Sequence, residues 1–134
     1  MYRYVDREIA TVGEAERLLV LAMRDWVAAA SRGRCPVDAI MPRMLAHRLV
    51  GGLEPFHFIM ATLARHGRTR FEFGCPCHRS VTEGEAVLLG TFLDDPAVRP
   101  HGWLVDAPHV PGVGEALAAV RAALAVAGMM RSTT

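Results

Sequence analysis

The stretch EAERLLVLAMRDWVAAAS, residues Glu14 to Ser31, decides the fold class of this 134-residue chain. Its apolar residues recur every three or four positions, which is the spacing of one face of an α-helix. The residues that carry this pattern are Ala15, Leu18, Leu19, Ala22, Trp26 and Ala29. The charged residues expected on the opposite, solvent-facing side are Glu14, Arg17, Arg24 and Asp25. The pattern therefore predicts a long amphipathic helix from about 13 to 31, ended by Gly33.

Two further helices are predicted directly downstream. The second is expected over about 37–50, with Pro36 at its first position and an irregular start near Pro42. Gly51-Gly52 is expected to break the chain. Glu54-Pro55 would then open the third helix, which ends at Gly67.

A helix start signal also lies further along the chain, at Thr82-Glu83-Gly84-Glu85. The Thr-x-x-Glu spacing fits a capping box, in which the threonine oxygen and the glutamate each accept a backbone N–H of the other residue. A short buried helix is expected to follow and to stop before Pro96. The last helix is expected over about 113–130, and its small residues would allow close helix packing.

The fold class predicted from these patterns is mainly α, with residues 1–134 forming a single compact domain of about five helices. Residues 1–12 would be an N-terminal extension, and residues 94–112, with four of the eight prolines, an irregular connection. Arg70-Phe71-Glu72-Phe73 alternates polar and aromatic residues, which predicts a minor short β segment before the Cys-Pro-Cys turn.

Composition narrows the classes of protein to be considered. Hydrophobic residues make up 51% and charged residues 22%, which is typical of a globular protein. A net charge of +1 argues against a chain-wide electrostatic surface for nucleic acid or membrane lipids. Charged residues in the first ten positions give no export signal, so a cytoplasmic protein with three reduced cysteines and no membrane segment is expected.

A candidate metal site is formed by the cysteines and a neighbouring histidine. Zinc prefers four thiolate or imidazole ligands, and Cys75 and Cys77 could share one ion across a turn held by Pro76. Cys35 would be the third ligand if the second and third helices return the chain to the same end. His78 is the fourth predicted ligand, and the substitutes considered for it are His47, His57 and His66.

Two other interpretations of the cysteines stay open. Free cysteine often behaves as a small buried hydrophobe, so the thiols could be inert. They could also serve redox chemistry or hold a haem, although an efficient dithiol usually has the spacing Cys-x-x-Cys.

A DNA-binding alternative rests on the segment 37–70. Two helices separated by Gly51-Gly52 resemble a helix-turn-helix, and a basic cluster over Arg65–Arg70 follows them. The expected second helix is mostly apolar, however, whereas DNA binding needs an exposed polar face.

Several of these motifs together resemble small uncharacterised bacterial helical protein families. The shared features are a leucine-rich first helix with Arg-x-Trp, the GCPC turn, and the acidic helix start TEGEAVLL, over roughly Glu14 to Leu89. The resemblance implies one compact helical domain with a recurring cysteine turn, and it transfers no catalytic residue. Some members lack the early cysteine, which implies that Cys35 is not an obligatory ligand.

The function predicted from the sequence is that of a non-catalytic accessory or regulatory protein with a structural zinc ion at the cysteine turn. The alternatives are a small DNA-binding regulator and a thiol-based redox sensor. A protein partner or a homodimer is expected to form through apolar helix faces.

Overall fold

The computed structural model describes residues 4–68, 70–93 and 104–129 of the chain. Within these residues the chain forms one compact helical domain, and the predicted fold class is confirmed. The helices are α1 (Glu14–Ser31), α2 (Pro36–Ala46), α3 (Val50–His66), α4 (Glu83–Leu93) and α5 (Val110–Val126), with two short 3₁₀ helices, η1 (Ile9–Thr11) and η2 (Ala107–His109).

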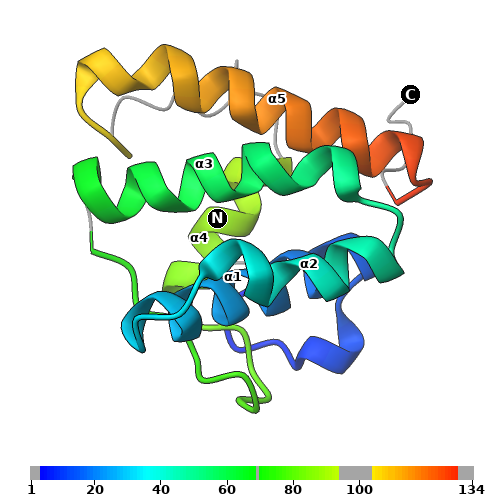
Figure 1. The fold of residues 1–134 in the computed structure, drawn as a ribbon. Helices are drawn as coiled ribbons and strands as arrows, with labels where there is room; N and C mark the ends of the chain where they lie inside the picture. Colours follow the sequence, from blue (N-terminus) through cyan, green and yellow to red (C-terminus); the bar gives the residue numbers. More distant parts are fainter. Residues whose placement is uncertain (1–3, 69, 94–103, 130–134) are drawn as a thin grey trace.

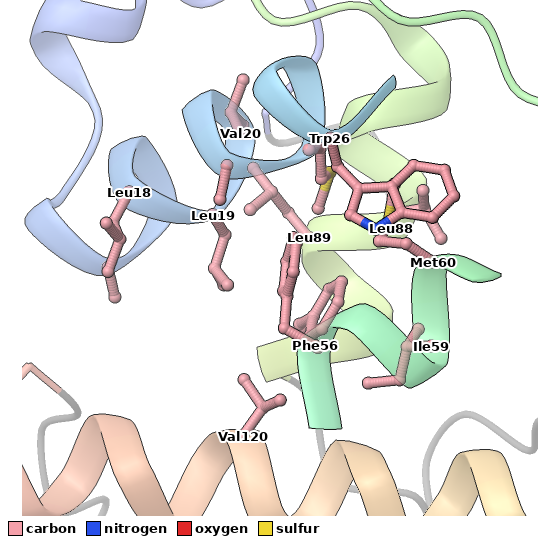
Figure 2. Packing of buried hydrophobic residues seen from close by; sticks show 14 of the residues in the cluster. Leu18, Leu19, Val20, Trp26, Phe56, Ile59, Met60, Leu88, Leu89 and Val120 are labelled. Atoms are coloured by element: carbon pink, nitrogen blue, oxygen red, sulfur yellow. The ribbon is translucent and has the colours of Figure 1, made fainter. Parts of the chain in front are cut away.

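The helices pack in two pairs. In Figure 1, α3 and α5 lie side by side in the upper part of the molecule, α1 and α2 lie below, and α4 lies behind, where it contacts both α1 and α5. Figure 2 shows how α1, α3, α4 and α5 meet in one core, with Phe56, Leu89 and Val120 turned toward one another. The aromatic rings of Phe56 and Phe92 stack within this core, with centroids 5.5 Å apart.

The boundary between α2 and α3 differs from the prediction. The chain is broken not by Gly51-Gly52 but by Arg48, whose φ of 59° lies in the left-handed region, and both glycines belong to the first turn of α3. Close packing explains why position 52 is a glycine, since a Cβ atom there would lie 3.3 Å from the Cβ of Ala123 on α5. Pro42 lies inside α2, which begins at Pro36 as expected but ends at Ala46.

The predicted β segment is not formed. Arg70 and Glu72 are exposed while Phe71 and Phe73 are half-buried, so the alternation is real, but no strand lies beside this segment in the described part of the chain. The carbonyl of Glu72 instead accepts a hydrogen bond from the Thr82 hydroxyl at 2.9 Å. The alternating pattern thus gives an extended segment without a sheet.

The last helix begins earlier than predicted. Pro111 lies in the first turn of α5, where a missing N–H costs little, and Gly128, with φ 79°, closes the helix near its other end. The predicted irregular connection over 94–112 is therefore shorter, and its residues 94–103 lie outside the described residues. By length and composition alone the segment Ala107–Val126 could span a membrane, and in the structure α5 packs against α3 and α4.

The N-terminal segment is fixed against the residues that follow the cysteines. Asp6 N–H donates to the carbonyl of Val81, Ile9 N–H to that of Arg79, and Val81 N–H to that of Arg7, at 2.8 to 2.9 Å. This antiparallel contact includes a bridge between Glu8 and Ser80. The extension therefore forms one side of the cysteine loop.

Candidate functional site

A buried ion pair lies directly beneath the cysteine loop. Arg24 of α1 and Glu85 of α4 have fully buried side chains, and the guanidinium binds the carboxylate through two hydrogen bonds of 2.7 and 2.8 Å. The prediction that Arg24 faces solvent is wrong. The sequence holds a signal for its burial, because Val20 and Val27 lie four residues before it and three after it on the same helix face.

The remaining hydrogen bonds of Arg24 go to the backbone of the loop. Nη1 donates to the carbonyl of His78, and Nη2 donates to the carbonyl of Ser80 at 2.8 Å. Gly74 packs over the guanidinium, where a Cβ atom would lie 3.0 Å from Cζ of Arg24. The buried charge thus fixes the loop from the inside.

Glu85 holds the two ends of the same loop. Its Oε2 accepts from the Gly74 N–H and its Oε1 from the Thr82 N–H, both at 2.9 Å. The Glu85 N–H donates in turn to the Thr82 hydroxyl at 3.2 Å, so the predicted capping box is confirmed. Burial alone would raise the pKa of Glu85, but the hydrogen bonds from Arg24, Thr82 and Gly74 hold it below its usual value.

The cysteines lie on a tight turn outside this buried pair. The His78 N–H donates to the carbonyl of Cys75 at 2.9 Å, which closes a four-residue turn with Pro76 at its second position, the position proline favours. Both thiols are exposed. The loop extends from the end of the molecule opposite α5 (Figure 1).

The two thiols of the turn lie close together. Their Sγ atoms are 3.4 Å apart, within hydrogen-bond distance. The thiol of Cys77 lowers the pKa of Cys75, helped by the backbone N–H groups of Cys77 and His78. The hydrogen bond with Cys75, and next the charge on Cys75, raise the pKa of Cys77. The first thiolate of the pair is therefore stabilised by the second thiol, which loses its own proton only at higher pH.

Cys35 lies at the N-terminal end of α2, outside the turn. Its thiol is exposed and lines a groove of about 820 Å³ between α1 and α2, whose wall Pro76 completes. The structure thus brings Cys35 to the same side of the molecule as the turn. Among the described residues, however, no group of three or more Cys, His, Asp or Glu side chains could hold a metal ion. The zinc ligand set Cys35, Cys75, Cys77 and His78 stays a prediction.

The substitute histidines are engaged elsewhere. His47 lies 3.8 Å from the carboxylate of Glu14. His57 accepts a hydrogen bond from the Trp26 indole N–H at its Nδ1, at 3.0 Å, as expected of a packing histidine. The ring of His66 stacks on that of His109, with centroids 3.8 Å apart.

The basic cluster considered for DNA binding is exposed at Arg65, Arg68 and Arg70. The apolar face of α3 is buried, with Phe56, Ile59 and Met60 in the core, while Glu54 and Phe58 are exposed. The DNA-binding alternative and a partner bound through apolar faces both stay predictions. The exposed large apolar residues are Met41, Leu45, Val50, Phe58 and Val126.

Comparisons with known proteins give no match: no family model fits the chain, and neither the curated proteins nor the solved structures include a significantly similar one. The resemblance to uncharacterised bacterial families therefore stays a prediction. The geometry of the cysteine loop alone supports the function proposed below.

Substitutions at the ion pair test its role in stability. Because each single change leaves the other charge buried without its partner, Arg24→Met and Glu85→Leu should each lower the free energy of unfolding by about 3–5 kcal/mol. The double variant should lose less than the sum of the two. Urea unfolding at pH 7 measures all three. As a control, Arg43→Met removes the more exposed pair with Asp25 and should cost below about 1 kcal/mol. A loss in the double variant that equals the sum of the two single losses would contradict an energetic coupling between Arg24 and Glu85.

Stability should also depend on pH through Glu85. Because its pKa is lower in the folded chain than in the unfolded one, its contribution is fully present above about pH 4.3 and is lost as the pH falls below that value. Glu85→Gln should therefore lose more stability at pH 7 than at pH 3, as measured by urea unfolding at both. Glu83→Gln, at an exposed position on the same helix, should show no such difference. A loss from Glu85→Gln that is equal at both pH values would contradict the assignment.

Proposed function

We propose that this protein is a cytoplasmic thiol-based redox sensor, in which Cys75 and Cys77 are reversibly oxidised to a disulfide. The observation that carries the proposal is a pair of exposed thiols 3.4 Å apart on a turn that is fixed by a buried ion pair. The S–S distance of a disulfide is about 2.05 Å, so the two Sγ atoms, now 3.4 Å apart, would have to approach by roughly 1.4 Å.

A contribution to the stability of the loop does not explain why cysteines occupy positions 75 and 77. The side chains of Arg24 and Glu85 bind the loop through backbone groups of Gly74, His78, Ser80 and Thr82, so the buried pair would hold the turn with other side chains at positions 75 and 77. Free cysteine is usually among the most buried residues, yet both thiols of the turn are exposed. Two thiols that pack against nothing in the core are better explained by chemistry.

The reaction needs an oxidant, which we take to be a disulfide. The thiolate of the pair attacks one sulfur of the oxidant, forming a mixed disulfide and releasing the first external thiolate, which takes up a proton. The second thiol of the pair then loses its proton and attacks the protein sulfur of this mixed disulfide, which releases the second external thiolate. Two protein thiols are oxidised, and one external disulfide is reduced to two thiols. Because the thiolate is the nucleophile, a hydrogen bond from the second thiol that stabilises the first thiolate favours the first step.

A cytoplasmic location agrees with this chemistry. The three cysteines are free, and a reducing compartment would keep the pair in its dithiol form until an oxidant appears.

Mass spectrometry of the oxidised chain tests the proposal. After treatment with a small disulfide, the chain should lose two hydrogens, and digestion should place the new bond between Cys75 and Cys77. Cys35→Ser should behave like the unchanged chain, whereas Cys75→Ser and Cys77→Ser should not form the bond. Oxidation that produces no bond between Cys75 and Cys77 would sink the proposal.

A structural zinc site is the second candidate, and the spacing of the same two thiols favours it. With Zn–S bonds of about 2.3 Å, two thiolates of a tetrahedral site lie roughly 3.7 Å apart, close to the 3.4 Å between Cys75 and Cys77. The other two ligands would be Cys35 and His78, after a movement of the loop or of the start of α2.

Elemental analysis and melting separate the two candidates. A structural zinc predicts about one ion per chain and a large drop in melting temperature with a chelator, because metal binding contributes to folding. A metal-free protein that melts at the same temperature with and without chelator excludes the zinc site and leaves the redox pair.

A further inference from the structure

A groove beside Cys77 points to the chemical class of the oxidant. Pro76 separates two grooves, and Cys77 lines the smaller one, of about 530 Å³. This volume is within the range of small-molecule sites. The groove lies between η1, α1 and the loop, so the contact of the N-terminal segment with residues 79–81 forms it.

The charge of this groove is mainly positive. Arg17 and Arg79 line it together with His78, and Glu8 is the only acidic residue among its lining. Neither guanidinium is in a hydrogen bond or ion pair with any residue in the described part of the chain. By contrast, Arg43 in the larger groove is paired with Asp25 at 2.9 Å.

The rest of the groove is apolar. Ile9, Ala10 and Leu21 line it beside Pro76. A ligand that fits would place aliphatic groups against these residues, anionic groups near the two arginines, and a sulfur near Cys77. This combination excludes cationic disulfides on electrostatic grounds.

We propose that the groove binds small disulfides whose substituents carry carboxylates, and that Arg17 and Arg79 select them. The proposal rests on the redox function given above. The groove then holds the oxidant with its disulfide at the turn and its carboxylates near the two guanidinium groups.

Rates of disulfide formation in the reduced full chain test this selectivity. The probes are oxidised glutathione, which carries carboxylates, neutral bis(2-hydroxyethyl) disulfide and cationic cystamine, each normalised to its rate with dithiothreitol. The normalised rates should fall in that order, with about tenfold between the acidic and the neutral probe, an effect within the range of electrostatic steering. The difference should shrink in 0.5 M salt, as charge interactions do.

Two matched double variants show which arginines cause the preference for the acidic probe. Arg17→Gln with Arg79→Gln should abolish the preference for the acidic probe. Arg32→Gln with Arg34→Gln removes the same charge from the larger groove and should leave the preference unchanged. Glu8→Gln should increase it. Equal normalised rates for the three probes, or an equal loss in both double variants, would overturn the proposal.

A separate binding measurement distinguishes failure of the groove from failure of the redox function. S-methylglutathione cannot exchange, so its binding to the chain, followed by calorimetry, reports on the groove alone. Binding that is lost in Arg17→Gln with Arg79→Gln supports the groove even if no probe oxidises the turn. Oxidation by all probes without such binding overturns the groove and leaves the redox function standing.

Discussion

The pair formed by Arg24 and Glu85 is the interaction on which the rest of this structure depends. Both charges are buried, so each would be costly without the other, and their hydrogen bonds reach four backbone positions of one loop. The pair therefore joins α1 to α4 and fixes the cysteine loop at the same time. We expect folding of the helical core and ordering of the loop to be coupled, because burial of both charges requires the loop to close over them.

This arrangement separates the cysteine turn from the core. Cys75, Cys77 and His78 are exposed, while the side chains beneath them are buried and saturated with hydrogen bonds. Under the proposed redox function, oxidation of the turn would alter the outer surface with little effect on helix packing. Residues 6–9 lie against the same loop, so they are the described segment best placed to respond to such a change.

Much of the fold could be predicted from the sequence, because helical periodicity and capping are local properties. The first helix and the Thr82–Glu85 capping box are examples. The break before α3 could not be predicted, because two successive glycines are typical of a turn. The close packing of α5 against Gly52, which explains the glycine there, is not visible in the sequence. At the site, the turn around Pro76 follows from local chemistry. The burial of Arg24 depends on a partner 61 residues away, and only its apolar neighbours Val20 and Val27 hint at it.

The backbone contacts of the loop have a consequence for protein design. The side chains of Arg24 and Glu85 bind carbonyl and N–H groups of the loop. At position 74 the guanidinium of Arg24 leaves no room for a side chain, so glycine is required there. The turn between these anchors is thus a natural display position, into which other four-residue turns could be grafted. The same scaffold could present a different pair of reactive side chains at a spacing set by the backbone rather than by the residues it carries.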